Sequence, residues 1–189
     1  MSPVVLRGDR VTLRPFREDE VDRLFAMMSA WPVDDGIHNV DGRPDREKIR
    51  EKVEVSGSWS DGPLGLLLAI EADGRLVGEL QARGGRAQLL PAGVFELGIE
   101  LYAPEDRGLG LGTAALVEVM RYLFQEEQAH RVQVSTDVAN AAMRRACERA
   151  GFAYEGVLRG FMPTSNGPRD YAMYGVTEND FEDVKTTST

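Results

Sequence analysis

Three glycines occupy alternate positions, Gly108, Gly110 and Gly112, directly before an apolar run with helical spacing. The first turn of a helix carries unpaired N–H groups and the positive end of the helix dipole, and glycines let an anion come close to both. Arg107 adds a positive charge immediately before the first glycine. The segment therefore predicts a phosphate-binding loop, and a turn that merely connects a strand to a helix is the alternative.

Two common nucleotide-binding loops do not fit this spacing. A P-loop ends in Gly-Lys-Ser or Gly-Lys-Thr, and residues 105–116 contain no lysine. A dinucleotide-binding fingerprint would place Thr113 where a small glycine or alanine is expected. The ligand of this loop therefore has to be inferred from the rest of the chain.

The composition is typical of an ordinary globular domain with an acidic surface. Of the 189 residues, 42% are hydrophobic and 28% are charged, which is enough for one domain with a substantial core. The net charge of −9 disfavours nucleic acid and anionic membranes as partners and favours a cationic substrate. We expect a single domain over residues 1–185, followed by a polar tail over residues 186–189.

Cysteine and histidine are too scarce for a disulfide or an ordinary zinc site. The single cysteine, Cys147, excludes an intramolecular disulfide, and the two histidines could complete a zinc site only with carboxylate ligands. No metal is therefore expected. The chain shows no secretion leader, and its longest apolar run, residues 64–70, is too short to span a bilayer. These features predict a cytoplasmic protein.

Hydrophobic periodicity predicts strands and helices in mixed order. The expected strands are residues 11–16, 64–72, 75–84, 94–102, 130–138, 152–162 and 169–177, and the expected helices are residues 18–28, 46–55, 113–127 and 139–151. An Asp-Gly pair at 73–74 indicates a tight hairpin, and Gly151 is placed to end the last helix. The order predicts an α/β (α+β) fold with a largely antiparallel sheet and one right-handed crossover connection.

The residues that follow the glycine loop suggest what it binds. The Arg-x-x-Gly-x-Gly pattern of residues 107–112, Asn140 and the Gly-Phe pair at 151–152 together resemble the GCN5-related N-acetyltransferase (GNAT) family. The opening segment 12–16 and the closing segment 169–181 are similar to its RimJ/RimL-type branch of ribosomal-protein N-terminal acetyltransferases. The resemblance covers nearly the whole chain.

The resemblance implies a GNAT fold, with a central mixed, mostly antiparallel sheet of six to seven strands flanked by about four helices. It implies acetyl-CoA as the donor, no metal, and transfer of the acetyl group to a primary amine by direct attack in a ternary complex. Backbone amides of the loop would hold the CoA pyrophosphate, and amides at the end of the preceding strand would stabilise the oxyanion. The implied CoA-binding residues are Leu101, Tyr102, Ala103, Arg107, Gly108, Leu109, Gly110, Leu111, Gly112, Thr113 and Asn140.

Three residues are candidates for proton transfer. Glu96 lies where many members of the family carry a catalytic glutamate, and strand alternation places Glu100 on the same face. Two carboxylates on one face can raise each other's pKa, which suits a base that works near neutrality, whereas a solvated strand face is the alternative. Cys147 occupies the family's usual position for a tyrosine that protonates the CoA sulfur, and a thiol packed in the core is the alternative. Asn140 is expected to contact the pantetheine arm, to cap a helix, or both.

The acceptor is expected to bind between an acidic loop, which joins the first two helices, and the last hairpin. The candidate residues are Trp31, Asp34, Asp35 and Asp41, whose carboxylates favour a cationic group. The resemblance implies a protein N-terminus or a small-molecule amine, with an aminoglycoside or another amine antibiotic as an alternative. A non-catalytic acyl-CoA-binding module is the alternative to an enzyme, and a homodimer is the default assembly.

Overall fold

Eight β-strands form one sheet in the structure, a computed structural model that describes residues 2–30, 44–61, 65–84 and 90–181. The strands are β1 (Leu6–Arg7), β2 (Thr12–Arg14), β3 (Leu66–Ala72), β4 (Arg75–Gly84), β5 (Val94–Leu101), β6 (Arg131–Asp137), β7 (Ala153–Met162) and β8 (Arg169–Thr177). Their order in the sheet is β1-β2-β3-β4-β5-β6-β8-β7, and each neighbouring pair is antiparallel except β5 and β6. The sheet is therefore mixed and mostly antiparallel, which confirms the expected class.

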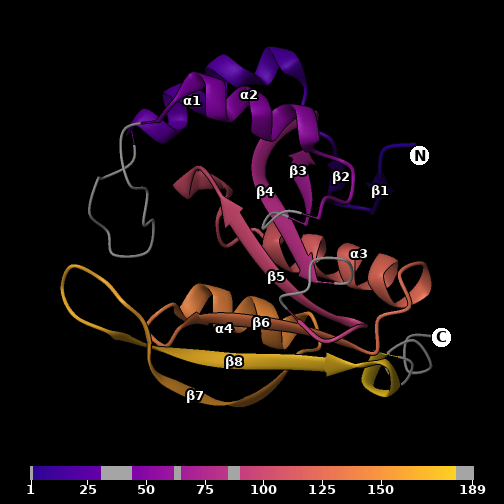
Figure 1. Ribbon diagram of the computed structural model, residues 1–189, viewed down its shortest axis with the longest axis vertical. Helices are drawn as coiled ribbons and strands as arrows, with labels where there is room; N and C mark the ends of the chain where they lie inside the picture. Colours follow the sequence, from indigo (N-terminus) through magenta and orange to yellow (C-terminus); the bar gives the residue numbers. More distant parts are fainter. Residues whose placement is uncertain (1, 31–43, 62–64, 85–89, 182–189) are drawn as a thin grey trace.

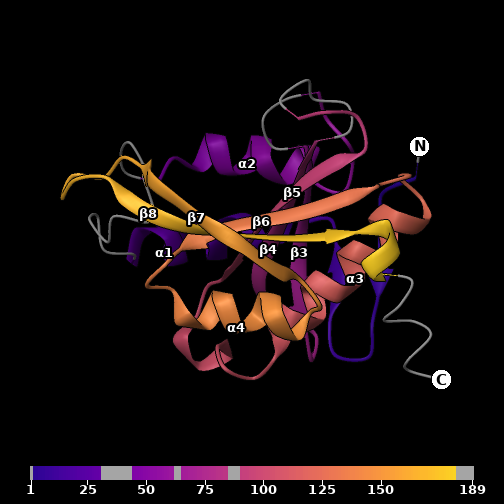
Figure 2. The same cartoon turned by 90° about the horizontal axis from the view of Figure 1, so that it is seen from below.

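Helices cover both faces of the sheet (Figure 1). The described chain contains α1 (Val21–Ala30), α2 (Arg46–Val55), α3 (Leu111–Gln125) and α4 (Ala141–Arg149), with short 3-10 helices η1 (Glu18–Glu20) and η2 (Pro104–Asp106). Figure 2 shows α1 and α2 on one face, and α3 and α4 on the other. Leu24 and Leu67 belong to the buried cluster beneath α1 and α2. Leu116 and Phe95 belong to the larger cluster beneath α3 and α4, so each helix layer has its own core.

Local sequence signals set most of the element boundaries. β4 and β8 span the residues predicted for them, and α2 does the same. The β3–β4 hairpin turns at Asp73 and Gly74, whose φ angles of +49° and +72° follow the turn type that matches the twist of the strands. β1 lies outside the predicted strands because two residues are too short to show alternation. It raises the number of strands to eight, one more than the upper limit expected.

The parallel pair at the centre of the sheet separates after three residues. Val94–Glu96 of β5 pair with Arg131–Gln133 of β6, and the pairing ends there. β5 stays paired with β4 through Leu101, and β6 stays paired with β8 along its full length. The two halves of the sheet consequently diverge from this point, as the directions of β5 and β6 show in Figure 1.

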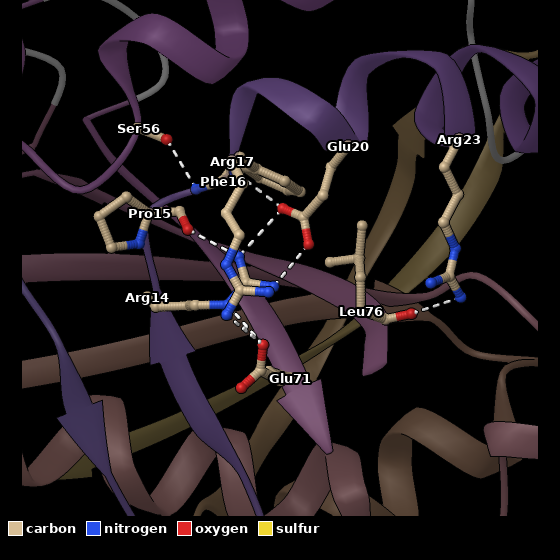
Figure 3. Close-up of polar contacts among 9 residues, drawn as sticks. All are labelled: Arg14, Pro15, Phe16, Arg17, Glu20, Arg23, Ser56, Glu71 and Leu76. Carbon is tan, nitrogen blue, oxygen red and sulfur yellow. Dashed lines mark hydrogen bonds and ion pairs between the residues drawn. The ribbon is translucent and has the colours of Figure 1, made fainter. Parts of the chain in front are cut away.

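A buried ion cluster joins the N-terminal strands to the start of α1 (Figure 3). Arg14 on β2 is 7% exposed and donates to Glu20 of η1 and to Glu71 of β3. Burial alone would raise the pKa of Glu20, but hydrogen bonds from Arg14 and from the Arg17 N–H outweigh it and lower that pKa. Loss of Arg14 would leave the buried carboxylate of Glu20 without a cation partner, and breaking a buried ion pair in this way costs about 3 to 5 kcal/mol. The cluster thus fixes where the α1–α2 layer begins.

Candidate active site

Alternation along β5 divides its side chains between the two faces of the sheet, as predicted. Phe95 and Leu97 are buried in the core beneath α3 and α4. Glu96 and Glu100 lie on the opposite face, and Tyr102 joins the core beneath α1 and α2. Both glutamates are half-buried. The strand face that carries them is therefore not simply solvated.

Glu96 lies at the last β5–β6 pair, where the strands part. One of its carboxylate oxygens accepts from Arg83 Nη2 and the other from Gln133 Nε2, each at 3.1 Å. Because these donors come from β4 and β6, on either side of β5, they hold the carboxylate in one orientation. Each carboxylate oxygen can accept a second hydrogen bond, so Glu96 keeps the capacity to receive a proton from a further group.

Glu100 faces Glu79 across the β4–β5 pair. Glu79 is 8% exposed, and one of its oxygens accepts from the Tyr102 hydroxyl (2.6 Å) and from Lys52 Nζ (2.5 Å). Burial, followed by the negative charge of Glu79, raises the pKa of Tyr102 well above its ordinary value. The Glu79 carboxylate on β4 therefore links the Tyr102 hydroxyl to Lys52 of α2, and no local pattern around Tyr102 in the sequence indicates this link.

A cleft of about 180 Å³ lies where β5 and β6 diverge. Its lining residues are Leu97, Gly98, Ile99, Val134, Ser135, Thr136, Asp137, Asn140, Met143 and Tyr171. Among the described residues, a Cβ added to Gly98 would have one neighbour within 4 Å, Arg83 Nη2 at 3.8 Å. No side chain of β5 therefore covers its backbone at Gly98. This leaves space for a ligand, as expected from a glycine between two glutamates.

Backbone groups of β5 are also directed toward the cleft. The N–H of Tyr102 donates to the Val77 carbonyl (3.0 Å) and belongs to the β4–β5 pair. Because backbone direction alternates along an antiparallel strand, the N–H groups of Ile99 and Leu101 point away from β4, to the side where β6 has diverged. The Leu101 carbonyl accepts from Arg107 Nη2 (3.2 Å) on that side. Of the amides expected to stabilise an oxyanion, that of Leu101 is suitably directed, whereas that of Tyr102 is used by the sheet.

The predicted phosphate-binding loop lies between η2 and α3. Gly108 and Gly110 have φ angles of +75° and +81°, a conformation that residues with a side chain rarely adopt. A Cβ on Gly110 would lie 3.1 Å from Arg10 Nη1, so a second guanidinium approaches the loop that begins with Arg107. Arg10 was outside the predicted site because it comes from the connection between β1 and β2, far away in the sequence.

The start of α3 completes the predicted phosphate-binding loop. The helix begins at Leu111, and its first amides, including those of Gly112 and Thr113, have no partner within the helix. Leu109 is 54% exposed, so the loop presents its backbone at the surface. Glycines, unpaired helix amides and two arginines thus lie together at the end of β5. All the loop residues predicted to bind phosphate are in this region.

Asn140 and Cys147 differ in their relation to the cleft. Asn140 precedes α4, accepts the N–H of Met143 on its side chain (3.1 Å) and also lines the cleft. Its role as a helix cap is confirmed, and its contact with a pantetheine arm stays a prediction. Cys147 is fully buried in the core and does not line the cleft. Burial, followed by the charge of Glu148, raises the pKa of its thiol to about 12, which favours a packing role.

Four polar residues line the cleft without having been predicted: Ser135, Thr136, Asp137 and Tyr171. Asp137 and Tyr171 are paired across β6 and β8, and Asp137 forms an ion pair with Arg169 Nε at 2.6 Å. No local sequence pattern links strands that are so distant along the chain. The acceptor residues predicted in the acidic loop, Trp31, Asp34, Asp35 and Asp41, lie outside the described residues.

The described residues contain neither a helix that could span a membrane nor a cluster of metal-binding side chains. No helix in residues 2–30, 44–61, 65–84 or 90–181 is both long and apolar enough to cross a membrane. Within the same ranges, histidine, cysteine and carboxylate side chains do not gather in groups of three that could hold a metal ion.

Comparisons with known proteins agree with this geometry. The family of the acetyltransferase (GNAT) domain matches residues 10–153. The mycothiol acetyltransferase of Arthrobacter sp. (strain FB24) is 30% identical over 151 residues, which make up 76% of this chain and 43% of that protein. The chain therefore spans less than half the length of this curated relative.

Solved structures share the fold across nearly the whole chain. A GCN5-related N-acetyltransferase from Brucella melitensis has a TM-score of 0.73 and 25% identity, and the match covers 98% of this chain and 84% of that one. RimL, a ribosomal L7/L12 alpha-N-protein acetyltransferase in complex with coenzyme A, has a TM-score of 0.76 at 17% identity, covering 92% and 98%. The second likeness concerns the fold alone.

Proposed function

Because the chain belongs to the GNAT acetyltransferase family, we propose that it transfers an acetyl group from acetyl-CoA to a primary amine by direct attack in a ternary complex. The observation that carries this proposal is the cleft where β5 and β6 diverge, which is lined by Gly98 of β5, the strand that precedes the glycine loop and α3. RimL, which has the same fold, is seen with coenzyme A. The residues present here are of the kind that such a donor needs.

The donor would be held mainly by backbone groups. The amides of Gly110 to Thr113 and the guanidinium of Arg107 would bind the pyrophosphate, and charge-assisted hydrogen bonds of this kind contribute about 1.5 to 3 kcal/mol each before desolvation. The N–H groups of Ile99 and Leu101 would bind the extended pantetheine arm, much as an added strand binds a sheet edge. Asn140 would contact the arm from the opposite wall of the cleft.

Glu96 is the general base in this proposal, and Glu100 is the second candidate. An amine must lose a proton as it attacks a thioester carbonyl. Glu96 lies where the strands part, directly before the cleft-lining residue Leu97, and is oriented by Arg83 and Gln133. An amine that approaches the cleft from this face of the sheet would meet it. The Leu101 amide would stabilise the oxyanion that forms on the carbonyl oxygen.

The acceptor is proposed to be the α-amine of a protein N-terminus or of a small cationic molecule. An α-amine has a pKa of about 7.7 to 8.0, against about 10.4 for a lysine amine, so a carboxylate base deprotonates it more readily. Among similar proteins, RimL is described as an alpha-N-protein acetyltransferase, and several curated relatives are mycothiol acetyltransferases. An aminoglycoside would also satisfy the preference for positive charge.

An amine panel tests this function. The protein is incubated with acetyl-CoA and one amine at a time, including peptides with free N-termini, amino sugars, polyamines and aminoglycosides, and free thiol and acetylated product are measured. We expect thiol release with at least one amine. Glu96→Gln should lower kcat by about 10²-fold or more, as for a lost general base, while calorimetry shows nearly unchanged affinity for acetyl-CoA.

The matched variant Glu100→Gln separates the two candidate bases. If Glu96→Gln turns over like the wild-type protein and Glu100→Gln does not, the base is Glu100. Acetyl-CoA binding without thiol release from any amine would contradict the proposed enzyme and favour a module that binds acyl-CoA without transferring the acyl group.

A further inference from the structure

Tyr171 lines the cleft where the acetyl group is proposed to be transferred. Tyr171 is 8% exposed, and Ile99 and Asn140 line the same cleft. No hydrogen bond joins the hydroxyl to another residue that the structure describes. The hydroxyl is therefore available to a ligand that enters the cleft.

The position of Tyr171 on β8 explains how it reaches the cleft. Its neighbours Ala172, Tyr174 and Val176 belong to the core beneath α3 and α4. Strand alternation therefore directs Tyr171 to the other face of the sheet, the face that carries Glu96. Val134, which also lines the cleft, belongs to the α3–α4 core. The cleft thus joins the two faces, and Tyr171 lies on the side from which Glu96 would receive an amine.

The charged neighbours of Tyr171 keep its proton in place. Asp137, its partner across β6 and β8, accepts the Ala139 N–H on Oδ1 (2.7 Å). Its Oδ2 forms an ion pair with Arg169 Nε (2.6 Å) and accepts no hydrogen bond from the residues that the structure describes. Burial and then the charge of Asp137 raise the pKa of Tyr171 above its ordinary value, although Arg169 opposes them. The ring of Phe161 packs against the Tyr171 ring, with 5.4 Å between the centroids. The phenol is therefore neutral near pH 7 and restrained in orientation.

We propose that Tyr171 is a catalytic residue whose hydroxyl protonates the CoA sulfur as the acetyl group leaves. This inference rests on the proposed function. The amine nitrogen bonds to the thioester carbonyl carbon, the C–S bond breaks with its electron pair on sulfur, and the sulfur takes the phenolic proton. The proton that the amine has given to Glu96 then restores the phenol, directly or through water, so charge and protons balance. Cys147 cannot fill this role from within the core.

Kinetics of Tyr171→Phe test the proposal in the full chain. With an amine that the wild-type protein acetylates, kcat should fall by about 10²-fold or more, the range for a lost general acid. The dissociation constant for acetyl-CoA, measured by calorimetry, should change less than about threefold because the hydroxyl is not part of the predicted phosphate-binding loop. Tyr154→Phe is the matched control, since that phenol lies on β7, is 52% exposed and is absent from the cleft. Its kcat should stay at the wild-type level.

A fluorinated tyrosine at position 171 distinguishes proton donation from a structural effect. Fluorination lowers the pKa of the phenol with little change in its shape. The acid form is then lost at lower pH, so the descending limb of the kcat profile should move to lower pH. If Tyr171→Phe loses activity but the descending limb of the kcat profile of the fluorinated protein does not move, proton donation is overturned. Wild-type turnover in Tyr171→Phe overturns it directly. If the phenylalanine variant does not fold, the fluorinated protein decides alone. Failure of the wild-type protein to acetylate any amine instead overturns the proposed function, and this inference with it.

Discussion

At the scale of single residues, contact rather than pKa decides which side chain can exchange a proton with a ligand. Burial is the first cause that raises the pKa of both Cys147 and Tyr171. Cys147 is fully enclosed in the core, whereas Tyr171 lines the cleft. A general acid has to reach the atom that it protonates. The thiol is therefore a packing residue, and the phenol is the proposed donor.

Replacing Cys147 by alanine should lower stability and spare catalysis. The change removes one buried sulfur atom from the core beneath α3 and α4, for which a loss of about 1 kcal/mol in the free energy of unfolding is expected. The kcat should remain close to the wild-type value because the thiol does not line the cleft. Chemical denaturation and steady-state kinetics measure the two effects. A large loss of turnover in a folded Cys147→Ala protein would contradict the packing role.

The wild-type protein and Cys147→Ala should also differ in how the free energy of unfolding depends on pH. The thiol has an ordinary pKa of 9.0 when exposed and about 12 in the folded protein. Above pH 9 the unfolded chain therefore releases this proton while the folded chain retains it, which favours unfolding by up to about 1.4 kcal/mol per pH unit. The stability of the wild-type protein should decline more steeply than that of Cys147→Ala between about pH 9 and pH 12. Parallel curves would show that the thiol ionises equally in both states.

At the scale of elements, the loop before α3 depends on backbone conformation and on open space. Gly110→Asp should abolish measurable binding of acetyl-CoA, because a carboxylate at the helix start repels the pyrophosphate and replaces bare backbone. Calorimetry measures the affinity. Gly74→Asp is the matched control: Gly74 has a similar φ of +72° but lies in the β3–β4 turn, with nothing described within 4 Å of an added Cβ. Equal affinity in the two variants would contradict the assignment of the loop.

Elements whose signals are local were predictable from the sequence. The Asp-Gly turn at residues 73–74 determines where β3 ends and β4 begins. Asp45 caps the start of α2 by accepting the Glu47 N–H. The face of β5 that carries Glu96 follows from period-two alternation. β1 was not predictable, because a two-residue strand is defined by its partner β2 rather than by its own residues. The partners of Glu96 on neighbouring strands likewise depend on register.

At the scale of the whole molecule, the site is assembled from elements that are distant along the chain. The order β5-β6-β8 brings Tyr171 to the cleft, and the packing of the β1–β2 connection brings Arg10 to the loop that contains Gly110. Arg10 belongs to no recognised motif, and the closing segment 169–181, which contains Tyr171, gave no indication of a residue in the cleft. Sequence patterns could therefore indicate the donor loop and the strand that carries Glu96, whereas these additional residues depend on sheet order, which periodicity does not specify.

The net charge of −9 belongs to the molecule as a whole, and it predicts how salt affects the acceptor. A negative protein raises the local concentration of cations, and this long-range attraction weakens as the Debye length falls from about 30 Å at 0.01 M salt to about 8 Å at 0.15 M. Two acceptors with the same attacking amine, one neutral elsewhere and one carrying two further positive charges, should therefore respond differently. The kcat/KM of the charged acceptor should fall by up to about tenfold over this range, measured at saturating acetyl-CoA, whereas that of the neutral acceptor should change little. Saturation with the donor removes the effect of salt on the CoA phosphates. Equal salt dependence for the two acceptors would contradict a role for the acidic surface in acceptor capture.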